Sequence, residues 1–411
     1  HKQKQKQKQS NIWSTKIPSK NLRNGTMTGL RYNGKRAIRA RWPNGNPETQ
    51  LFPEGWSNAV TWGLPKTFDT PVATTIVVNT PNRSNEGPCE VTNGFCYYTT
   101  GINGACLSYG FDPASGYWCS KSPPRGQQYS TSFPANLQIN SSETFFHSFT
   151  PNQTIVNAFR SGHWFSYVFL IDQYNSTTNN MSWTIGGFQG GEGVNTAAEF
   201  NIENHFDLLD SENEWFYNKD TEILYWFYND TANAAPPLDL LLEGTQLQEL
   251  IRIQGAGTAL NEKGAHVVDV LVQGLIFTGT AASYLEPHGL PSDGGGDWAL
   301  ARTAAINVEG NKNINIQNCL FERLDGNGLL ISGYNRNVSV RNNEFRWIGE
   351  NPIISWGYTS DFDHANVSRP VPIPKGQGPS ATDGNHPQGT QIDGNFFHEI
   401  GHYQKQVSCY F

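Results

Sequence analysis

The chain has 411 residues and a formal net charge of −7, and 37% of its residues are hydrophobic. This is a globular composition, and no apolar run approaches the roughly 18 residues that a membrane span needs. The mild acidic excess argues against nucleic acid as a main partner, because such partners select a concentrated basic face. Glycine and asparagine are equally frequent, and 12% of the residues are aromatic. Since Gly and Asn favour tight turns and aromatic residues favour strands, the sequence predicts an all-β protein.

The chain divides into five segments by composition. They are a polar tail (1–10), an N-terminal β region (11–85), a Cys-rich insertion (86–145), a second β region with hairpins (146–235) and a repetitive coil (236–411). The tail alternates Lys and Gln, so we expect it to be solvated. If it were ordered as a strand, a neighbouring copy, an acidic surface or a glycan would have to hold it. It has no apolar stretch, and any signal peptide has been removed or precedes this numbering.

Two hairpins are expected before the coil. Residues 27–42 alternate around Asn33-Gly34, which is a strong signal for a two-residue hairpin turn. Residues 214–227 contain two aromatic strands around a turn at 218–220. Both patterns predict antiparallel pairing.

Cysteine and asparagine patterns indicate the compartment. Four cysteines cluster within the insertion: Cys89, Cys96, Cys106 and Cys119. Two disulfides would stabilise this stretch, and all three pairings remain open. Nine Asn-x-Ser/Thr glycosylation sequons are present, at Asn24, Asn82, Asn140, Asn152, Asn175, Asn180, Asn229, Asn337 and Asn366. Together they predict a secreted, extracellular glycoprotein.

The two other cysteines lie in the coil. We expect Cys319 to be unpaired and packed in the core. Cys409 is a candidate for pairing with chain beyond residue 411. Because the sequence has no metal-binding Cys spacing, we expect no structural metal.

A repeat organises the last 180 residues. Four phenylalanines carry matching upstream residues: Phe277, Phe321, Phe345 and Phe397. Three residues earlier stand Gly274, Asn318, Asn342 and Gly394, and five earlier stand Val272, Ile316, Val340 and Ile392. We expect a complete 24-residue turn to contain three strands. In the first complete turn these strands are 306–308, 314–316 and 320–321. Asn342, Asn343 and Asn395 suit stacks of side-chain amides.

Each turn is too short to bury its own apolar side chains, so stacked turns must share a core. The sequence therefore predicts a right-handed parallel β-helix, with Gly or Asn at the strained corner. A leucine-rich horseshoe would need a Leu-x-x-Leu-x-Leu frame, which is absent. Longer gaps predict loops at 283–298 and 358–389 that would line a ligand groove. The coil ends without a cap, so we expect more chain, a C-terminal fragment or a partner to cover it.

Several stretches resemble a known family. They include Asn33-Gly-Lys-Arg, Glu203-Asn, Glu214-Trp-Phe, Gly296-Asp-Trp-Ala-Leu, Asp325-Gly-Asn-Gly, Asn343-Glu-Phe-Arg-Trp-Ile-Gly, Asp383-Gly-Asn and Glu399-Ile-Gly. From about residue 27 to 411 the chain resembles secreted, pectin-lyase-like parallel β-helix proteins, many of them uncharacterised and often classed as glycoside hydrolases. The resemblance implies fold and secretion, but this fold hosts lyases, hydrolases and non-enzymes. The paired Asp-Asp and Gly-His-Gly of the galacturonan hydrolases and the Arg-x-Pro-x-x-Arg of the pectate lyases are absent.

Glycoside hydrolysis requires two carboxylates across the scissile bond. Asp325 and Glu350 follow successive ladder phenylalanines, so we expect them at one corner of neighbouring turns, at a spacing that suits a retaining mechanism. The alternative is that Asp325 before Gly only forms a turn. Glu399 and His402, with Lys405, form a second candidate cluster for acid–base work, and solvated or corner-bonding roles are its alternative.

Two weaker sites complete the candidates. Asp361 and Asp363, with His364, could bind calcium in a loop, although such loops usually bind nothing; no other cofactor is expected. Trp298, Trp347 and Trp356 would stack on sugar rings if exposed, with buried packing as the alternative.

Two functions follow from these features. The first is a carbohydrate-active protein that hydrolyses an extracellular polysaccharide. The second is a non-catalytic structural glycoprotein that self-associates into an extracellular fibre or coat.

Overall fold

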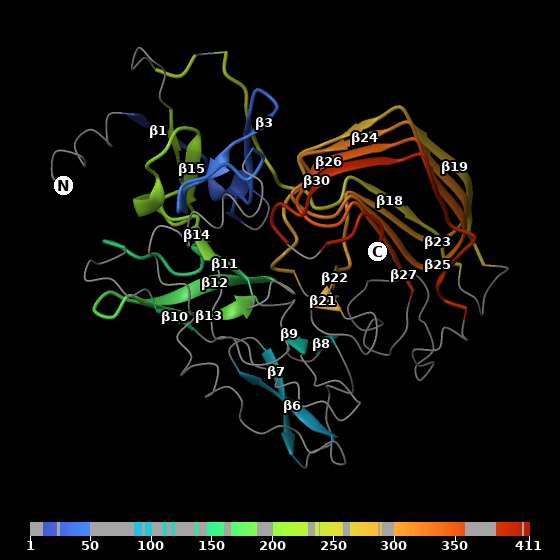
Figure 1. Cartoon of the computed structure of the whole chain (residues 1–411), viewed down its shortest axis with the longest axis horizontal. Coiled ribbons are helices and arrows are strands. Elements are labelled where there is room, and N and C mark those ends of the chain that lie inside the picture. The colour runs from blue at the N-terminus through green and yellow to red at the C-terminus, as the bar shows by residue number, and fades with distance from the viewer. Residues whose placement is uncertain are drawn as a thin grey trace.

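The computed structural model describes residues 11–22, 25–49, 86–92, 95–100, 110–112, 117–119, 136–138, 146–159, 166–186, 200–228, 235–237, 239–257, 264–286, 288–289, 300–357, 384–404 and 407–411. Within these ranges the named elements are strands and two short 3-10 turns, η2 (Ser19–Asn21) and η4 (Phe206–Leu208). The all-β prediction is confirmed. In Figure 1 an antiparallel region lies beside a coil of stacked strands, and a smaller sheet lies below them.

The antiparallel region contains three sheets, made by segments from both sides of the Cys-rich insertion and by one strand, 136–138, from within its predicted range. One has the order β1 (Ile12–Lys16), β16 (Ile223–Phe227), β15 (Glu214–Asn218) and β4 (Ile38–Arg39). The second has the order β10 (Asn136–Gln138), β13 (Asn180–Gly186), β12 (Ser166–Asn175), β11 (Ile155–Phe159), β14 (Phe200–Glu203) and β5 (Arg41–Trp42). The third has the order β17 (Leu242–Gly244), β2 (Leu30–Tyr32) and β3 (Lys35–Arg36).

Both predicted hairpins are confirmed. Strands β2 and β3 pair around Asn33 and Gly34, whose φ values of 46° and 74° are those of a left-handed turn. Strands β15 and β16 pair antiparallel up to Asn218 and Ile223. Because β17 pairs with β2 and leads into the coil, the hairpin at Asn33 also ties the two regions together.

The insertion contributes a four-stranded sheet with the order β6 (Glu86–Thr92), β7 (Phe95–Thr100), β9 (Tyr117–Cys119) and β8 (Gly110–Asp112). Its backbone register sets Cys96 beside Cys119. Cys106 and the side chains of this sheet lie outside the described part of the chain. The disulfide pairing therefore stays a prediction.

The coil is built from two long parallel sheets. One contains β18 (Ile251–Gln254), β19 (Val267–Gln273), β23 (Ile306–Gln317), β25 (Leu329–Arg341), β27 (Ile353–Trp356), β28 (Pro387–Gln388) and β29 (Gln391–Asp393). The other contains β20 (Ile276–Phe277), β24 (Leu320–Glu322), β26 (Glu344–Ile348) and β30 (Phe396–Ile400). A short antiparallel pair, β21 (His288–Gly289) and β22 (Leu300–Ala301), lies beside them.

The predicted phenylalanine register is confirmed. Phe277, Phe321, Phe345 and Phe397 are direct partners on neighbouring strands. Their rings stack with centroid distances of 4.8, 4.4 and 5.1 Å. This ladder is part of the coil's core, together with the aliphatic columns that precede each phenylalanine.

The division of each turn differs from the prediction. The first two expected strands of a turn form one strand, β23, and the same is true of β25. Gly310 (φ 75°) and Gly333 (φ 59°) lie within these strands and bend them without ending the hydrogen-bonded ladder. A register shift between Glu309 and Asn311 accompanies the first bend.

The corners need left-handed backbone, as expected. The predicted Gly/Asn column has positive φ throughout: Gly274, Asn318, Asn342 and Gly394. Two further positive-φ columns were not predicted, namely Asp269, Asn313, Asn337 and Gly389, and Gly279, Arg323, Trp347 and Glu399. The predicted amide stack is present, because Asn343 Nδ2 donates to Asn395 Oδ1 at 2.9 Å.

The two cysteines of the coil differ in their exposure. Cys319 is free and buried, as predicted, whereas Cys409 is free and exposed. Among the residues with described positions, no helix has the length and apolarity to cross a membrane. The predicted loops at 283–298 and 358–389 lie largely outside the described residues.

Candidate functional site at the junction of the two regions

The four catalytic candidates follow one corner of successive turns. Asp325 lies four residues after Phe321, and Glu350 lies five residues after Phe345. Glu399 and His402 lie two and five residues after Phe397. Because the phenylalanines are in register, all four occupy the same side of the coil. The antiparallel region packs against this corner.

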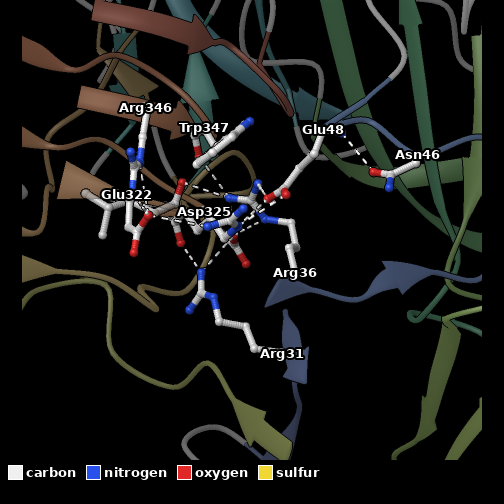
Figure 2. A network of polar contacts seen from close by, with 10 residues as sticks. Arg31, Arg36, Asn46, Glu48, Glu322, Asp325, Arg346 and Trp347 are labelled. Atoms are coloured by element: carbon white, nitrogen blue, oxygen red, sulfur yellow. Dashed lines mark hydrogen bonds and ion pairs between the residues drawn. The ribbon is translucent and has the colours of Figure 1, made fainter. Parts of the chain in front are cut away.

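Asp325 is enclosed in the contact between the antiparallel region and the coil. Its side chain is 1% exposed, and its Oδ1 accepts a hydrogen bond from Arg36 Nε at 2.9 Å. Arg31 Nη2 lies 3.7 Å from the same oxygen. Glu48 joins the network through Arg36 Nη1 at 2.8 Å and Arg323 Nε at 3.0 Å. Figure 2 shows Arg31 of β2, Arg36 of β3 and Glu48, which follows these strands, around Asp325 of the coil.

The arginines also satisfy backbone carbonyls at the corner. Arg36 Nη2 donates to the carbonyls of Trp347 at 3.0 Å and Leu324 at 3.4 Å, and Arg31 donates to the carbonyl of Arg323. Burial lowers the pKa of Arg36, but Asp325 and Glu48 more than offset this, so the net shift is upward. The Arg36 guanidinium therefore stays charged, and Asp325 is its counter-ion in the interface, whereas burial lowers the pKa of the neighbouring Arg31 despite the same carboxylate.

Glu350 is equally enclosed. It is 0% exposed, and its Oε1 accepts hydrogen bonds from Ser283 N at 3.1 Å and Ser283 Oγ at 2.8 Å. A Cβ at Gly326, on the intervening turn, would lie 2.8 Å from Ser283 Oγ, so glycine leaves the space for this contact. Burial raises the pKa of Glu350 to about 8, although the Ser283 hydrogen bonds act in the opposite direction. A general acid benefits from such a pKa but must also reach its substrate, and in this structure Glu350 does not contact solvent.

The remaining candidates are placed differently. Glu399 and His402 are partly exposed, and Glu399 occupies a corner with φ 52°. His402 N donates to the carbonyl of Ile348 at 3.2 Å, which fixes the backbone there. Asp361, Asp363, His364, Lys405 and Trp298 lie outside the described residues. In the described ranges, no three His, Cys, Asp or Glu side chains are grouped so as to hold a metal ion.

Two of the candidate sugar-stacking tryptophans stack on arginines. Trp347 is partly buried, with Arg323 Cζ 4.0 Å and Arg346 Cζ 5.0 Å from its ring centroid. Trp356 is buried, with Arg302 Cζ 3.8 Å from its ring. Cation–π packing therefore accounts for both rings.

A second arginine cluster continues the junction. Arg39 Nη1 donates to the Tyr284 hydroxyl at 2.7 Å and lies 3.3 Å from Glu203 Oε2. Burial raises the pKa of Tyr284 to about 12, so this hydroxyl stays protonated. An apolar seam surrounds the pair, made by Ile155, Val168, Ala282 and Tyr284.

A cavity opens beside this seam, between the antiparallel region and the first turn of the coil. Its volume is about 380 Å³, which lies within the range of small-molecule sites. It is partly open to solvent and is lined mostly by amide, hydroxyl and aliphatic side chains. The lining residues are Thr26, Met27, Thr28, Arg39, Asn152, Gln153, Ile155, Leu170, Asn204, Thr245, Gln246, Gln248, Ala281, Ala282, Tyr284, Leu285 and Glu286.

Two lining amides each keep one hydrogen-bonding atom without a partner among the described residues. Gln153 is buried and its Oε1 accepts from Lys219 N at 3.1 Å, while its Nε2 donor is unmatched. Asn204 Nδ2 donates to the Gln153 carbonyl at 2.7 Å, while its Oδ1 acceptor is unmatched. Each of these enclosed atoms carries the cost of an unpaired buried polar group, and a side-chain adjustment that turned them toward the cavity would let a ligand pair with both.

Sequence reasoning missed the partners of the predicted residues. They are the arginines of the N-terminal region and Ser283; Tyr284 and the amides of the cavity were missed as well. One signal was available: Arg31, Arg36, Arg39 and Arg41 fall within a short run of strands in a chain with few charges, and all four are buried. Buried arginines require carboxylate partners, which the sequence does not place.

Comparisons with known proteins give the fold. No family model matches the chain, and no curated protein matches it. A solved structure named "Glycoside hydrolase" is similar over 97% of this chain, with a TM-score of 0.54 and 14% sequence identity. The chain spans 58% of that protein's length. The fold is therefore glycoside hydrolase-like.

Proposed function

We propose that this chain is a secreted, carbohydrate-active glycoprotein of the pectin-lyase-like β-helix type that binds a saccharide in the junction cavity. The observation that carries the proposal is a cavity of about 380 Å³ lined mostly by amide, hydroxyl and aliphatic side chains, two of which, Gln153 and Asn204, each keep one polar atom without a partner among the described residues. A sugar hydroxyl both donates and accepts hydrogen bonds, so adjacent hydroxyls complement an amide N–H and an amide oxygen together. The glycoside hydrolase-like fold agrees with this ligand class.

The charges at the cavity favour a neutral sugar. Arg39 lies in the lining, but Glu203 and the Tyr284 hydroxyl already occupy its guanidinium. Glu286 contributes a carboxylate at the exposed rim, where it accepts a hydrogen bond from Gln248 Nε2 at 2.8 Å. An acidic sugar would meet this carboxylate without an available cation among the described lining residues. The substrate class is therefore a neutral extracellular polysaccharide or glycan.

Hydrolysis is a further step of the same proposal. It needs two carboxyl groups on opposite sides of the bond that breaks. Glu286 is the carboxylate among the described lining residues, while Asp325 and Glu350 are enclosed in the interface. Binding is therefore the function that this geometry supports, and hydrolysis would require a second carboxyl group at the same cavity.

Calorimetric titration with neutral and uronic-acid oligosaccharides tests the proposal. We expect the neutral series to bind and the acidic series not to bind. Gln153→Met removes the unmatched donor at nearly constant side-chain length and should weaken binding about tenfold or more, since a lost hydrogen bond in a site costs about 1–2 kcal/mol. Gln173→Met, on the exposed side of β12, is the matched control and should bind as the wild type does. Equal binding by both variants would refute the cavity as the site.

The alternative, a structural glycoprotein in an extracellular assembly, has one observation in its favour. The first turn of the coil exposes several large apolar side chains on edge strands β19 and β20, including Leu271 (56% exposed) and Ile276 (66% exposed). Exposed apolar edges favour association with another chain. Light scattering of the purified protein tests this: a concentration-independent monomer would exclude it.

A further inference from the structure

One glycosylation sequon lies at the rim of the junction cavity. Asn152, of the sequon Asn152-Gln153-Thr154, is exposed and lines the cavity. Its backbone is held on both sides, because its N–H donates to the Ile171 carbonyl at 2.9 Å and its carbonyl accepts from Lys219 Nζ at 3.3 Å. Its side-chain amide makes no hydrogen bond within the described residues. The backbone is therefore fixed while the acceptor nitrogen of the sequon stays accessible.

Other sequons with described positions are engaged in turns or ladders. Asn175 accepts hydrogen bonds through Oδ1 from Thr177 N at 2.9 Å and Thr178 N at 3.2 Å, in the exposed turn after β12. Asn337 donates through Nδ2 to Asn313 Oδ1 at 3.1 Å, in a corner ladder of the coil. Neither residue lines the junction cavity. Asn175 is therefore a natural reference for Asn152.

We propose that Asn152 carries an N-linked glycan whose first sugars cover the junction cavity and compete with free saccharide. This inference rests on the proposed function, because it assigns a regulator to the same site. The donor is a lipid-diphosphate-linked oligosaccharide. The Asn152 amide nitrogen forms a bond to C1 of the first sugar, the bond from C1 to the diphosphate oxygen breaks, and the amide proton leaves with the released diphosphate.

The neighbouring side chains favour this arrangement. Gln153 follows Asn152 directly, and it lines the cavity together with Asn204. The hydroxyls of an attached sugar can hydrogen-bond to lining side chains such as these without entering from solution. A tethered ligand reaches an effective concentration on the order of millimolar, so it displaces a weakly bound free sugar.

The test compares glycosylated wild type with variants that lack this glycan, all made in a glycosylating eukaryotic host. Asn152→Gln removes the acceptor, and Thr154→Val removes the sequon hydroxyl, which is buried and has no partner among the described residues. Asn175→Gln is the control. Glycopeptide mass spectrometry should find sugar on Asn152. Both variants that lack the Asn152 glycan should bind neutral oligosaccharide roughly five- to tenfold more tightly than wild type, and Asn175→Gln should not.

A second measurement does not depend on ligand binding. The rate at which a peptide N-glycosidase releases each glycan from the native protein should be several-fold slower at Asn152 than at Asn175, because the cavity shields the first sugars. An unmodified Asn152, or equal release rates together with unchanged oligosaccharide affinity, would overturn the inference. Slow release at Asn152 without oligosaccharide binding by any variant would support the inference and refute the binding of free saccharide.

Discussion

Arg36 Nε donates to Asp325 Oδ1 at 2.9 Å, which joins two buried side chains that are 289 positions apart in the chain. One belongs to a short strand of the antiparallel region and the other to a corner of the coil. Because both partners are enclosed, solvent screens this ion pair less than it would a surface pair. The contact fixes the position of the antiparallel region relative to the coil. The shape of the cavity between them depends on that position.

The first prediction concerns this counter-ion. Asp325→Ala leaves the buried Arg31 without its carboxylate partner and leaves Arg36 with Glu48 alone, and removing one partner of a buried pair costs about 3–5 kcal/mol. We expect a loss of that size in the free energy of unfolding, measured by chemical denaturation, together with weaker saccharide binding. Asp220→Ala, in an exposed turn, is the control and should change stability by less than about 0.5 kcal/mol. A mild effect of Asp325→Ala would show that the interface does not depend on this pair.

The second prediction concerns the proton on Glu350. Burial raises its pKa in the folded state to about 8, from an ordinary value of 4.5. The stabilisation linked to this proton is complete below pH 4.5 and is lost as the pH rises through about 8, because the unfolded chain then gains from ionising. Glu350→Gln should therefore match the wild type near pH 5 and exceed it in stability by a few kcal/mol at pH 9.

Thermal denaturation at a series of pH values measures this difference. Glu243→Gln changes an exposed carboxylate on β17 and should leave the pH profile unchanged. Burial also raises the pKa of Glu214 to about 8. Because Glu214 is unchanged in these variants, each of them still loses some stability at alkaline pH. Parallel profiles for wild type and Glu350→Gln would contradict an enclosed, protonated Glu350.

The coil was predictable because its information is local. Each turn repeats the spacing between a phenylalanine, its aliphatic columns and a corner Gly or Asn, and stacking requires such repetition. The hairpin at Asn33-Gly34 was predictable for the same reason, since the turn chemistry lies within two residues. The bends at Gly310 and Gly333 were not predicted. A glycine with positive φ ends some strands and only bends others, and the sequence does not distinguish the two outcomes.

The side-chain contacts at the junction could not be predicted from the sequence, for a different reason. The pattern placed Asp325 and Glu350 at one corner but did not show what covers that corner. Their partners, Arg36 and Ser283, come from other segments, and a single sequence holds no signal for such long-range pairs. The Glu350 contact is reflected in the sequence at one position, because Gly326 lies one turn before Glu350 and leaves room for the Ser283 hydroxyl that Glu350 accepts from.

The third prediction tests the stacked core. Phe345 is fully buried between the rings of Phe321 and Phe397, so Phe345→Ala should cost about 3–5 kcal/mol in the free energy of unfolding. Phe396→Ala, one residue from Phe397 on the same strand but 62% exposed, should cost less than about 0.5 kcal/mol. Chemical denaturation measures both. Comparable losses would mean that the ladder does not carry the coil's core packing.

The fourth prediction concerns the corner at Gly274, which has φ 68° and no atom within 4 Å of an added Cβ. Space is therefore not limiting there, and backbone strain alone decides the outcome. Asn occupies the same column at Asn318 and Asn342 with φ 51° and 53°, so Gly274→Asn should be close to neutral. Gly274→Val places a branched side chain in the left-handed region and should cost about 1–2 kcal/mol. Gly349→Ala is the steric counterpart, because its Cβ would lie 2.2 Å from the Asp325 carbonyl oxygen, and it should destabilise more than either. If Gly274→Asn and Gly274→Val were equally destabilising in denaturation experiments, positive φ would not be what selects Gly and Asn at this corner.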